Sequence, residues 1–243
     1  MRLTVVGCSP AWPNPGGAQS GYLVESDGGS ALLDCGPGVL ARLRGGEISH
    51  DPDAIVITHF HLDHWGDLVP WVWRGINLKG RGATVRKPAL WLPPGGSELL
   101  ERFGSLLGFP DMFERVFTLA EYTANVGFTA GGYTITAIRV PHYDVEAYAL
   151  RVVGDDRVLT YSADSGPGEA LVAAAHGADL FLCEATLING DVDGEPRGHL
   201  SLDEARAAFE ASGAKKLLIT HRPAELDAPD DVELAYDGLV RSV

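Results

Sequence analysis

The chain has 243 residues and a formal net charge of −14, from 33 acidic and 19 basic side chains. Apolar residues make up 45 % of it, which is usual for a globular protein with a core. This length suits one sizeable domain, and because no break in composition divides the chain, we expect a single domain over residues 1–243. An acidic surface repels phosphate backbones at long range, so extended nucleic acid is not an expected partner.

Cysteine usage and hydropathy bear on the compartment. The three cysteines, Cys8, Cys35 and Cys183, are odd in number and lack CxxC spacing, so no disulfide framework is indicated. The first residues run straight into a strand pattern rather than a signal peptide, and no apolar stretch approaches the ~20 residues that span a bilayer. We therefore expect a cytoplasmic protein without a membrane partner.

Short apolar runs between glycine-rich turns predict strands along the whole chain. In chain order we expect them at residues 3–6, 22–24, 31–34, 54–57 and 89–92, as a pair around Gly131 within 126–140, and at 147–153, 157–161, 180–183 and 216–220.

Helical periodicity and capping residues predict helices between these strands. We expect them at residues 39–44, 66–78, 98–107 with Ser97 as N-cap, 111–117, 167–176, and from the Ser201 capping box to residue 211. Hairpins alternate with single helices twice over, which favours an α+β fold, an αββα sandwich of two mainly antiparallel sheets with helices outside. The helix at 66–78 is rich in tryptophan and offers one surface for a homodimer.

Three imidazoles and one carboxylate follow the apolar run at 54–57, in the pattern H-x-H-x-D-H. They belong to His59, His61, Asp63 and His64. Neutral imidazole and ionised carboxylate are ligands suited to zinc, manganese or iron. A polar loop that merely happens to be rich in histidine is the plainer alternative. Four such polar groups at one strand end would pack badly, however, without an ion to hold them. The pattern therefore predicts a metal site, with enough ligands for two ions.

Three further candidates, His142, Asp164 and His221, each lie just past an expected strand. Taken singly, such a histidine is more often a structural group. Strand ends place side chains on one rim of a sheet, however, so distant positions can converge there. Together with the upstream cluster they supply seven ligands, which suffices for two metals with room for water.

These residues resemble the metallo-β-lactamase superfamily over almost the whole chain. The resemblance implies an αββα fold that holds two divalent metals, usually zinc, although His/Asp sites also accept manganese and iron. It further implies that His59, His61 and His142 bind one metal, that Asp63, His64 and His221 bind the other, and that Asp164 bridges them.

Asp164 also separates the chain from the β-lactamases proper, which have a cysteine there and are exported. The segments at 161–167, 183–187 and 198–201 look like the ribonuclease Z and phosphodiesterase branch instead. In that branch the second segment usually reads H-E-A-T, so Cys183 is a departure, whereas Glu184 and His199 match. The resemblance implies that His199 assists the leaving group.

Ribonuclease Z grips tRNA with a long arm between its third histidine and its bridging aspartate. Here that interval, from His142 to Asp164, is only 22 positions long and is filled by an expected hairpin. The chain therefore looks most similar to the armless group that contains bacterial cyclic-nucleotide phosphodiesterases.

The expected chemistry is attack of a metal-bridging hydroxide on phosphorus. Asp63 would orient that hydroxide, and His199, with Glu184 as its partner, would protonate the departing oxygen. Plainer roles stay open: His199 could support the Ser201 cap, and Glu184 could anchor a loop. Arg222 could meet a phosphate or form a surface salt bridge. His50 and His176 follow no ligand pattern and are expected to be structural.

The favoured function is thus a dinuclear metal-dependent phosphodiesterase for a small nucleotide or cyclic nucleotide. A ribonuclease Z-like tRNA 3′ endonuclease is one alternative. Hydrolysis of a lactone, thioester or aryl sulfate by the same fold is another. A metal-binding scaffold without activity is least favoured, because a scaffold needs no open coordination position.

Overall fold

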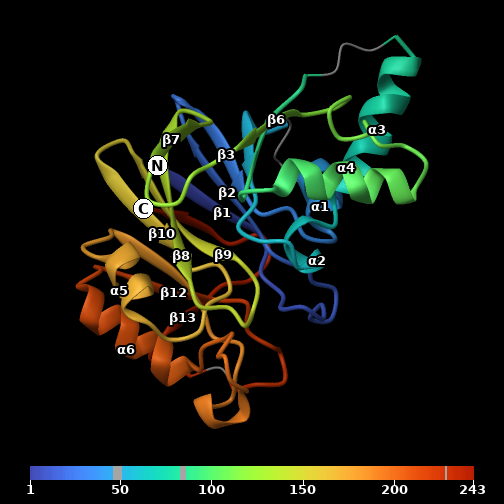
Figure 1. The fold of residues 1–243 in the computed structure, drawn as a ribbon. Helices are drawn as coiled ribbons and strands as arrows, with labels where there is room; N and C mark the ends of the chain where they lie inside the picture. The colour runs from blue at the N-terminus through green and yellow to red at the C-terminus, as the bar shows by residue number, and fades with distance from the viewer. Residues whose placement is uncertain (46–50, 83–85, 228) are drawn as a thin grey trace.

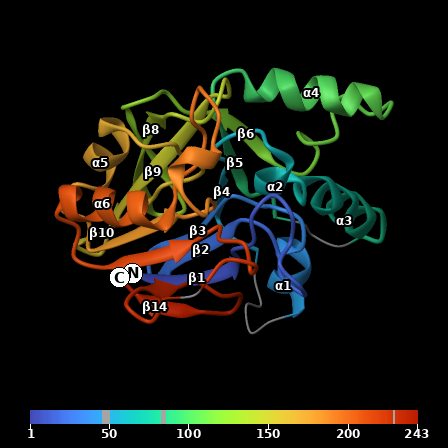
Figure 2. The same ribbon diagram turned by 90° about the horizontal axis from the view of Figure 1, so that it is seen from below.

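The computed structural model of the protein describes residues 1–45, 51–82, 86–227 and 229–243. Two seven-stranded sheets pack face to face, and helices cover the outer face of each (Figure 1). Figure 2 shows the same layers from below, with α5 and α6 on one side and α1, α2, α3 and α4 on the other. The expected αββα sandwich is confirmed.

The first sheet has the strand order β14-β1-β2-β3-β4-β5-β6. Its strands are β1 (Arg2–Gly7), β2 (Gly21–Ser26), β3 (Gly29–Leu33), β4 (Ala54–Val56), β5 (Ala89–Leu92), β6 (Thr118–Glu121) and β14 (Val240–Ser242).

The second sheet has the order β13-β12-β11-β10-β9-β8-β7. Its strands are β7 (Gly127–Ala130), β8 (Tyr133–Val140), β9 (Ala147–Gly154), β10 (Arg157–Tyr161), β11 (Leu180–Glu184), β12 (Leu217–Thr220) and β13 (Glu233–Leu234).

The helices connect neighbouring strands of the same sheet. They are α1 (Val39–Gly45), α2 (Leu62–Trp65), α3 (Leu68–Gly80), α4 (Gly96–Leu106), α5 (Glu169–Ala175) and α6 (Leu202–Ser212), with a short 3₁₀ helix η1 (Gly190–Val192). None of the described helices is long and apolar enough to cross a membrane.

The strand pairing is evenly divided rather than mainly antiparallel as expected. Each sheet has three antiparallel pairings and three parallel ones. Parallel neighbours require a crossover connection, and most of these connections contain a helix, as between β10 and β11, where α5 lies. The parallel strands end on one edge, which is where the candidate ligands lie.

The apolar core has three layers. Inner residues such as Tyr22, Val24 and Leu150 fill the space between the sheets. A second cluster, with Leu23 and Trp71, packs the first sheet against its helices, and a third packs the second sheet against α5 and α6. Both faces of each sheet are therefore buried, which explains why so many strands read as unbroken apolar runs.

Two expected helical features are wrong. The start of α4 is not capped by Ser97: the helix begins at Gly96, and the carboxylate of Glu121 on β6 accepts the N–H groups of Gly95 and Ser97. The expected helix at 111–117 is a series of turns, because backbone bonds to the third residue back, such as Val116 to Phe113, interrupt the helical pattern.

The tryptophans near α3 differ in burial, and the cysteines form no disulfide. Trp65 and Trp71 are buried, whereas Trp73 remains 44 % exposed on α3. All three cysteines are buried and unpaired.

Candidate metal centre

The seven predicted ligands meet at the edge where β4, β8, β10 and β12 end. His59 follows β4, His61 precedes α2, and α2 contains Asp63 and His64. The other three, His142, Asp164 and His221, follow β8, β10 and β12. All except the partly exposed His61 are buried. Residues up to 158 positions apart in the chain thus come into contact.

The side chains form two groups that share Asp164. One contains His59, His61, His142 and Asp164, and the other contains Asp63, His64, Asp164 and His221. Within each group one ligand atom per residue lies within 4.8 Å of the others. This division is the one that the resemblance implied.

The two oxygens of Asp164 face different groups. Oδ1 lies 3.2 Å from Nε2 of His64 and 3.5 Å from Nε2 of His221. Oδ2 lies 3.8 Å from Nε2 of both His59 and His142. A carboxylate in this position can bind one ion through each oxygen.

Several of these atoms are buried without a hydrogen-bond partner. Nε2 of His59, Nε2 of His64 and Oδ1 of Asp164 are among them. Nδ1 of His61 and Nε2 of His142 lie 2.9 Å apart, so two ring nitrogens face each other. Buried polar atoms are rarely left unpaired, and nitrogen and oxygen atoms that converge in this way fit a divalent metal.

The outward ring nitrogens of four of these histidines are held by neighbouring groups. Nδ1 of His142 donates to the carbonyl of Gly198 at 2.7 Å. Nδ1 of His59 lies 3.1 Å from the Thr58 hydroxyl, and Nδ1 of His221 lies 2.9 Å from the Thr186 hydroxyl. Such outer contacts fix the ring orientation and leave Nε2 free for a metal. His64 follows the same pattern.

The partner of His64 is Asp34, which the sequence interpretation missed. Oδ2 of Asp34 lies 2.7 Å from Nδ1 of His64. The same carboxylate accepts the N–H and hydroxyl of Thr58 and the hydroxyl of Tyr161. Asp34 is fully buried after β3 and has a left-handed backbone with φ of 60°, a conformation that costs energy in a residue other than glycine.

Glu184 does two things that the sequence interpretation treated as alternatives. Its carboxylate accepts the backbone N–H groups of Ser165 and Thr186 and the Thr186 hydroxyl, so it anchors two loops. Its Oε1 also lies 2.8 Å from Nδ1 of His199. The His199 ring therefore contacts Glu184, and its ring centroid lies 5.0 Å from that of His142.

Burial and neighbouring charges set the protonation of the two groups. Burial lowers the pKa of His59, His61 and His142, so these imidazoles are neutral, as metal ligands must be. Burial would raise the pKa of Asp164, but His221 and His64 hold it well below its usual value. Burial opposes a charge on His64, yet Asp164 and Asp34 raise its pKa.

His199 differs from the other histidines. Burial alone would lower its pKa, but the charge and hydrogen bond of Glu184 outweigh this and raise the pKa to about 9. His199 therefore carries a proton at neutral pH, next to the first group of candidate ligands.

The departure at Cys183 concerns packing. Cys183 is fully buried in the core between the second sheet and its helices, and burial raises the pKa of its thiol. Glu184, the next residue, faces the site. The substitution of histidine by cysteine in the H-E-A-T pattern thus leaves the candidate ligands untouched.

Neither Arg222 nor His176 contributes an atom to the two groups of candidate ligands. The Arg222 guanidinium donates to the carbonyls of Ala185 and Asp227 rather than to a carboxylate. His176 stands at the C-cap of α5. His50 lies outside the described residues.

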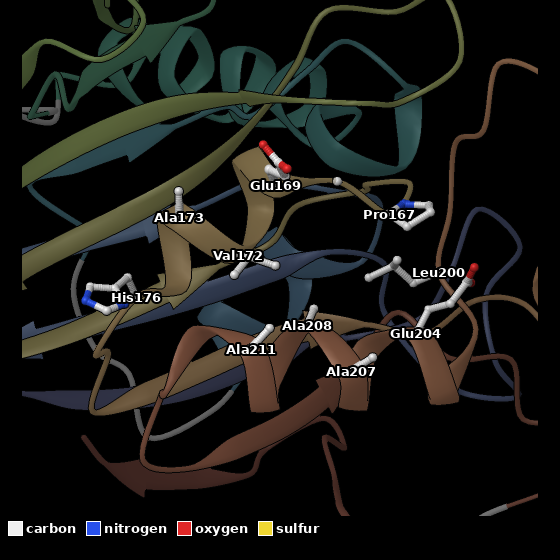
Figure 3. A pocket seen from close by; sticks show the side chains of 11 residues that line it. Pro167, Glu169, Val172, Ala173, His176, Leu200, Glu204, Ala207, Ala208 and Ala211 are labelled. Carbon is white, nitrogen blue, oxygen red and sulfur yellow. The ribbon is translucent and has the colours of Figure 1, made fainter.

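A separate groove of about 800 Å³ lies between α5 and α6 (Figure 3). Small and apolar side chains such as Val172, Ala208 and Ala211 line it, and none of its lining residues is a candidate ligand. Its end, at Leu200 and Glu204, adjoins the segment that carries His199.

Comparison with known proteins places the chain in a family. Residues 30–222 match the family model of the β-lactamase superfamily domain. The chain is 34 % identical to a probable metallo-hydrolase, YhfI, of Bacillus subtilis, over 92 % of this chain and 87 % of that protein. It is 26 % identical to a ribonuclease Z of Agathobacter rectalis, over 95 % of this chain and 90 % of the relative.

Solved structures agree on the fold. The crystal structure of the metallo-β-lactamase fold protein YhfI superimposes with a TM-score of 0.85 at 26 % identity, covering 99 % of this chain and 98 % of that one. The short form of human tRNase Z superimposes with a TM-score of 0.78 at 23 % identity, covering 100 % and 99 %. The family match, the close relative and the converging His/Asp groups together show that the chain belongs to the β-lactamase superfamily and is a metallo-hydrolase.

Proposed function

We propose that residues 1–243 form one hydrolase domain that binds two divalent metal ions and cleaves a small phosphodiester, such as a cyclic nucleotide. The observation that supports this most directly is Asp164, whose two oxygens face two separate groups of ligand atoms. Zinc is the favoured metal, and manganese or iron would also suit histidine and aspartate ligands.

The proposed ligands are the two groups defined above. His59, His61 and His142 would hold one ion, Asp63, His64 and His221 the other, and Asp164 both. When bound, two such ions activate water as a nucleophile and polarise the phosphoryl oxygens.

The chain's own residues supply the rest of the chemistry. Oδ2 of Asp63 lies 3.2 Å from Nε2 of His221 at the second group, where it can orient the attacking water. His199 is protonated at neutral pH and lies beside the first group, so it can donate a proton to the departing oxygen. Glu184 holds the other ring nitrogen of His199 and so directs its remaining N–H.

A small substrate suits the surroundings of the site. The interval from His142 to Asp164 contains only β9, β10 and their tight turn, so no tRNA-gripping arm lies there. Arg197 and Arg222 make their hydrogen bonds within the chain, which leaves them poorly placed to pair with a polyanion. The net charge of −14 acts in the same direction.

The phosphodiester itself is supported by the relatives named ribonuclease Z, since cleavage of RNA breaks this bond. Processing of tRNA is therefore the second candidate. A lactone, thioester or aryl sulfate is the third, because the same two-metal chemistry serves those bonds.

Hydrolysis of bis(p-nitrophenyl) phosphate by zinc- or manganese-loaded protein tests the proposal. The wild type should release p-nitrophenol, and an Asp63→Ala variant should lose about 100-fold or more of the rate, because Asp63 both binds a metal and orients water. Glu210→Ala, at an exposed position on α6, is the control and should keep the wild-type rate.

Parallel assays decide between the candidates. If the protein cleaves cyclic AMP and leaves a pre-tRNA uncut, the favoured substrate is supported. If it cleaves the pre-tRNA and leaves cyclic AMP intact, tRNA processing is supported. Lactone or thioester turnover without phosphodiester cleavage under any divalent metal would exclude the phosphodiesterase.

A further inference from the structure

Asp193 lies at the centre of the loop that presents His199. It follows η1 directly, and its side chain is only 4 % exposed. Oδ2 of Asp193 accepts the backbone N–H groups of Gly198 at 2.8 Å and His199 at 3.1 Å, together with Nε of Arg197 at 3.2 Å. Oδ1 accepts the hydroxyl of Tyr143 at 3.0 Å. Four donors from two separate segments thus meet on one carboxylate.

The two backbone bonds fix two successive peptide units, the second of which contains the carbonyl of Gly198 and the N–H of His199. The carbonyl of Gly198 accepts Nδ1 of His142 at 2.7 Å, and the ring of His199 points to Glu184. A rotation of this peptide would therefore disturb a candidate metal ligand on one side and the candidate acid on the other. The hydrogen bond from the His199 N–H to Asp193 opposes that rotation.

Tyr143 packs closely against the loop that contains Gly198 and His199. The Tyr143 ring lies directly against Gly198, where an added Cβ would come within 2.3 Å of the ring. The Tyr143 backbone is left-handed, with φ of 49°, and its N–H donates to the carbonyl of Arg197 at 3.1 Å. The ring centroid of Tyr143 lies 5.5 Å from that of His199.

Arg197 ties the same loop to helix α6. Its Nη2 donates to the carbonyl of His199 and to the carboxylate of Glu204, which also completes the capping box with Ser201. Figure 3 shows Glu204 on α6 beside Leu200. Arg197 thus ties the loop to α6, and Asp193 ties it to Tyr143.

We propose that Asp193 is a positioning residue that holds His199 in the orientation from which it protonates the leaving oxygen. This inference rests on the proposed function, in which His199 is the general acid. Asp193 acts through the backbone of His199 and does not touch the substrate.

A test must separate positioning from simple stabilisation of the loop. General-acid catalysis matters most when the leaving oxygen is strongly basic, as in a nucleoside alkoxide, and least for p-nitrophenolate, which leaves without a proton. A positioning role therefore predicts an effect that depends on the leaving group. A structural role predicts an equal effect on all substrates.

The experiment compares zinc-loaded wild type with Asp193→Asn, His199→Ala and the double variant. We expect Asp193→Asn to lower kcat for cyclic AMP about 100-fold, with KM little changed, and to cleave bis(p-nitrophenyl) phosphate within about threefold of wild type. His199→Ala should show the same selectivity, and the double variant should be no worse than His199→Ala alone. Asp191→Asn, an exposed carboxylate two residues upstream, is the matched control and should behave as wild type.

Each other result overturns the proposal. Equal losses on both substrates would make Asp193 structural, and an unchanged rate on cyclic AMP would leave it without a role. Inactivity of the wild type on every phosphodiester would instead remove the proposed function. Positioning is then decided by NMR of ¹⁵N-labelled zinc-loaded protein: the His199 ring resonances should shift in Asp193→Asn but not in Asp191→Asn, and identical spectra would refute it.

Discussion

Asp34 and Glu184 are buried carboxylates that support the candidate site from opposite sheets. Asp34 follows β3 in the first sheet, and Glu184 ends β11 in the second. Each is fully buried. Each also accepts the hydroxyl of a threonine, Thr58 or Thr186, whose oxygen lies within 3.1 Å of Nδ1 of a candidate ligand. In each sheet a buried carboxylate thus contacts a threonine hydroxyl, and that hydroxyl contacts the imidazole of a candidate ligand. The ligand is His59 beside the first sheet and His221 beside the second.

The difference lies in the second histidine that each carboxylate holds. Asp34 contacts His64, whose Nε2 faces Asp164 within the second group of ligands. Glu184 contacts His199, which stands outside the seven predicted ligands. Asp34 therefore orients two histidines of the candidate ligand groups, whereas Glu184 orients one candidate ligand and leaves the other histidine protonated. In our proposal this is the division between metal binding and proton transfer.

We expect the largest effect, a loss of zinc affinity, from substitution of Asp34. Asp34→Asn keeps the volume but turns an amide N–H toward groups that need an acceptor, including Nδ1 of His64. Loss of such an outer partner lowers metal affinity about 10- to 100-fold, and here two histidines are affected. Competition titration with a zinc chelator measures it. If Glu184→Gln weakens zinc binding as much as Asp34→Asn does, the two carboxylates are equivalent and the proposed division is wrong.

Glu184→Gln should act on catalysis instead. Without its carboxylate the His199 ring loses both its orientation and the charge that keeps it protonated, so kcat for cyclic AMP should fall about 100-fold. Zinc affinity should fall by about tenfold or less, since only His221 is indirectly affected. Steady-state kinetics beside the chelator titration measure both. A fall in zinc affinity that accounts for the whole loss of rate would contradict the role of His199.

Some of this arrangement could be read from the sequence, and the reason is local spacing. His59, His61, Asp63 and His64 lie within six positions, so their crowding is visible without a fold. His142, Asp164 and His221 follow apolar runs, and strand ends bring such positions together. Asp34 also stands at the end of an apolar run, in the expected strand at 31–34, but a single aspartate there does not by itself suggest a ligand. Its partners could not be identified from the sequence, since Tyr161, one of its donors, is 127 positions away.

The fold shows the same limit. Strands buried on both faces were predicted, but β6, β13 and β14 were not, because they are short and β6 and β13 are partly, β14 wholly, exposed. They form strands only because a neighbour offers a free edge. The start of α4 is a similar case, since its N–H groups are capped by Glu121, some 24 residues later. Non-local partners of this kind leave no pattern in the chain.

The contact between His199 and Glu184 should make the stability of the protein depend on pH. The pKa of His199 is raised to about 9 from 6.5, so the stability that the charged ring contributes is fully present below about pH 6.5 and is lost as pH rises through about 9. In metal-free protein, the difference in unfolding free energy between wild type and His199→Gln should therefore shrink from pH 6 to pH 9.5. Urea unfolding at several pH values measures it. A difference that stays constant with pH would mean that His199 is not held charged by Glu184.

We expect the smallest effect on zinc affinity from substitution of the two threonines. It tests whether each threonine hydroxyl orients its neighbouring histidine in the same way. Thr58→Val and Thr186→Val have nearly the same shape as wild type and remove one hydroxyl each. A hydrogen bond of this kind contributes about 1 kcal/mol. Its loss should therefore lower zinc affinity by up to about tenfold in each variant. Chelator titration of both proteins under identical conditions gives the two values. Similar losses would mean that each hydroxyl orients its own histidine, as the distances of 3.1 and 2.9 Å indicate. A loss in Thr58→Val alone would mean that Thr186 serves Glu184 rather than His221, and Glu184 would then support proton transfer without supporting the metal.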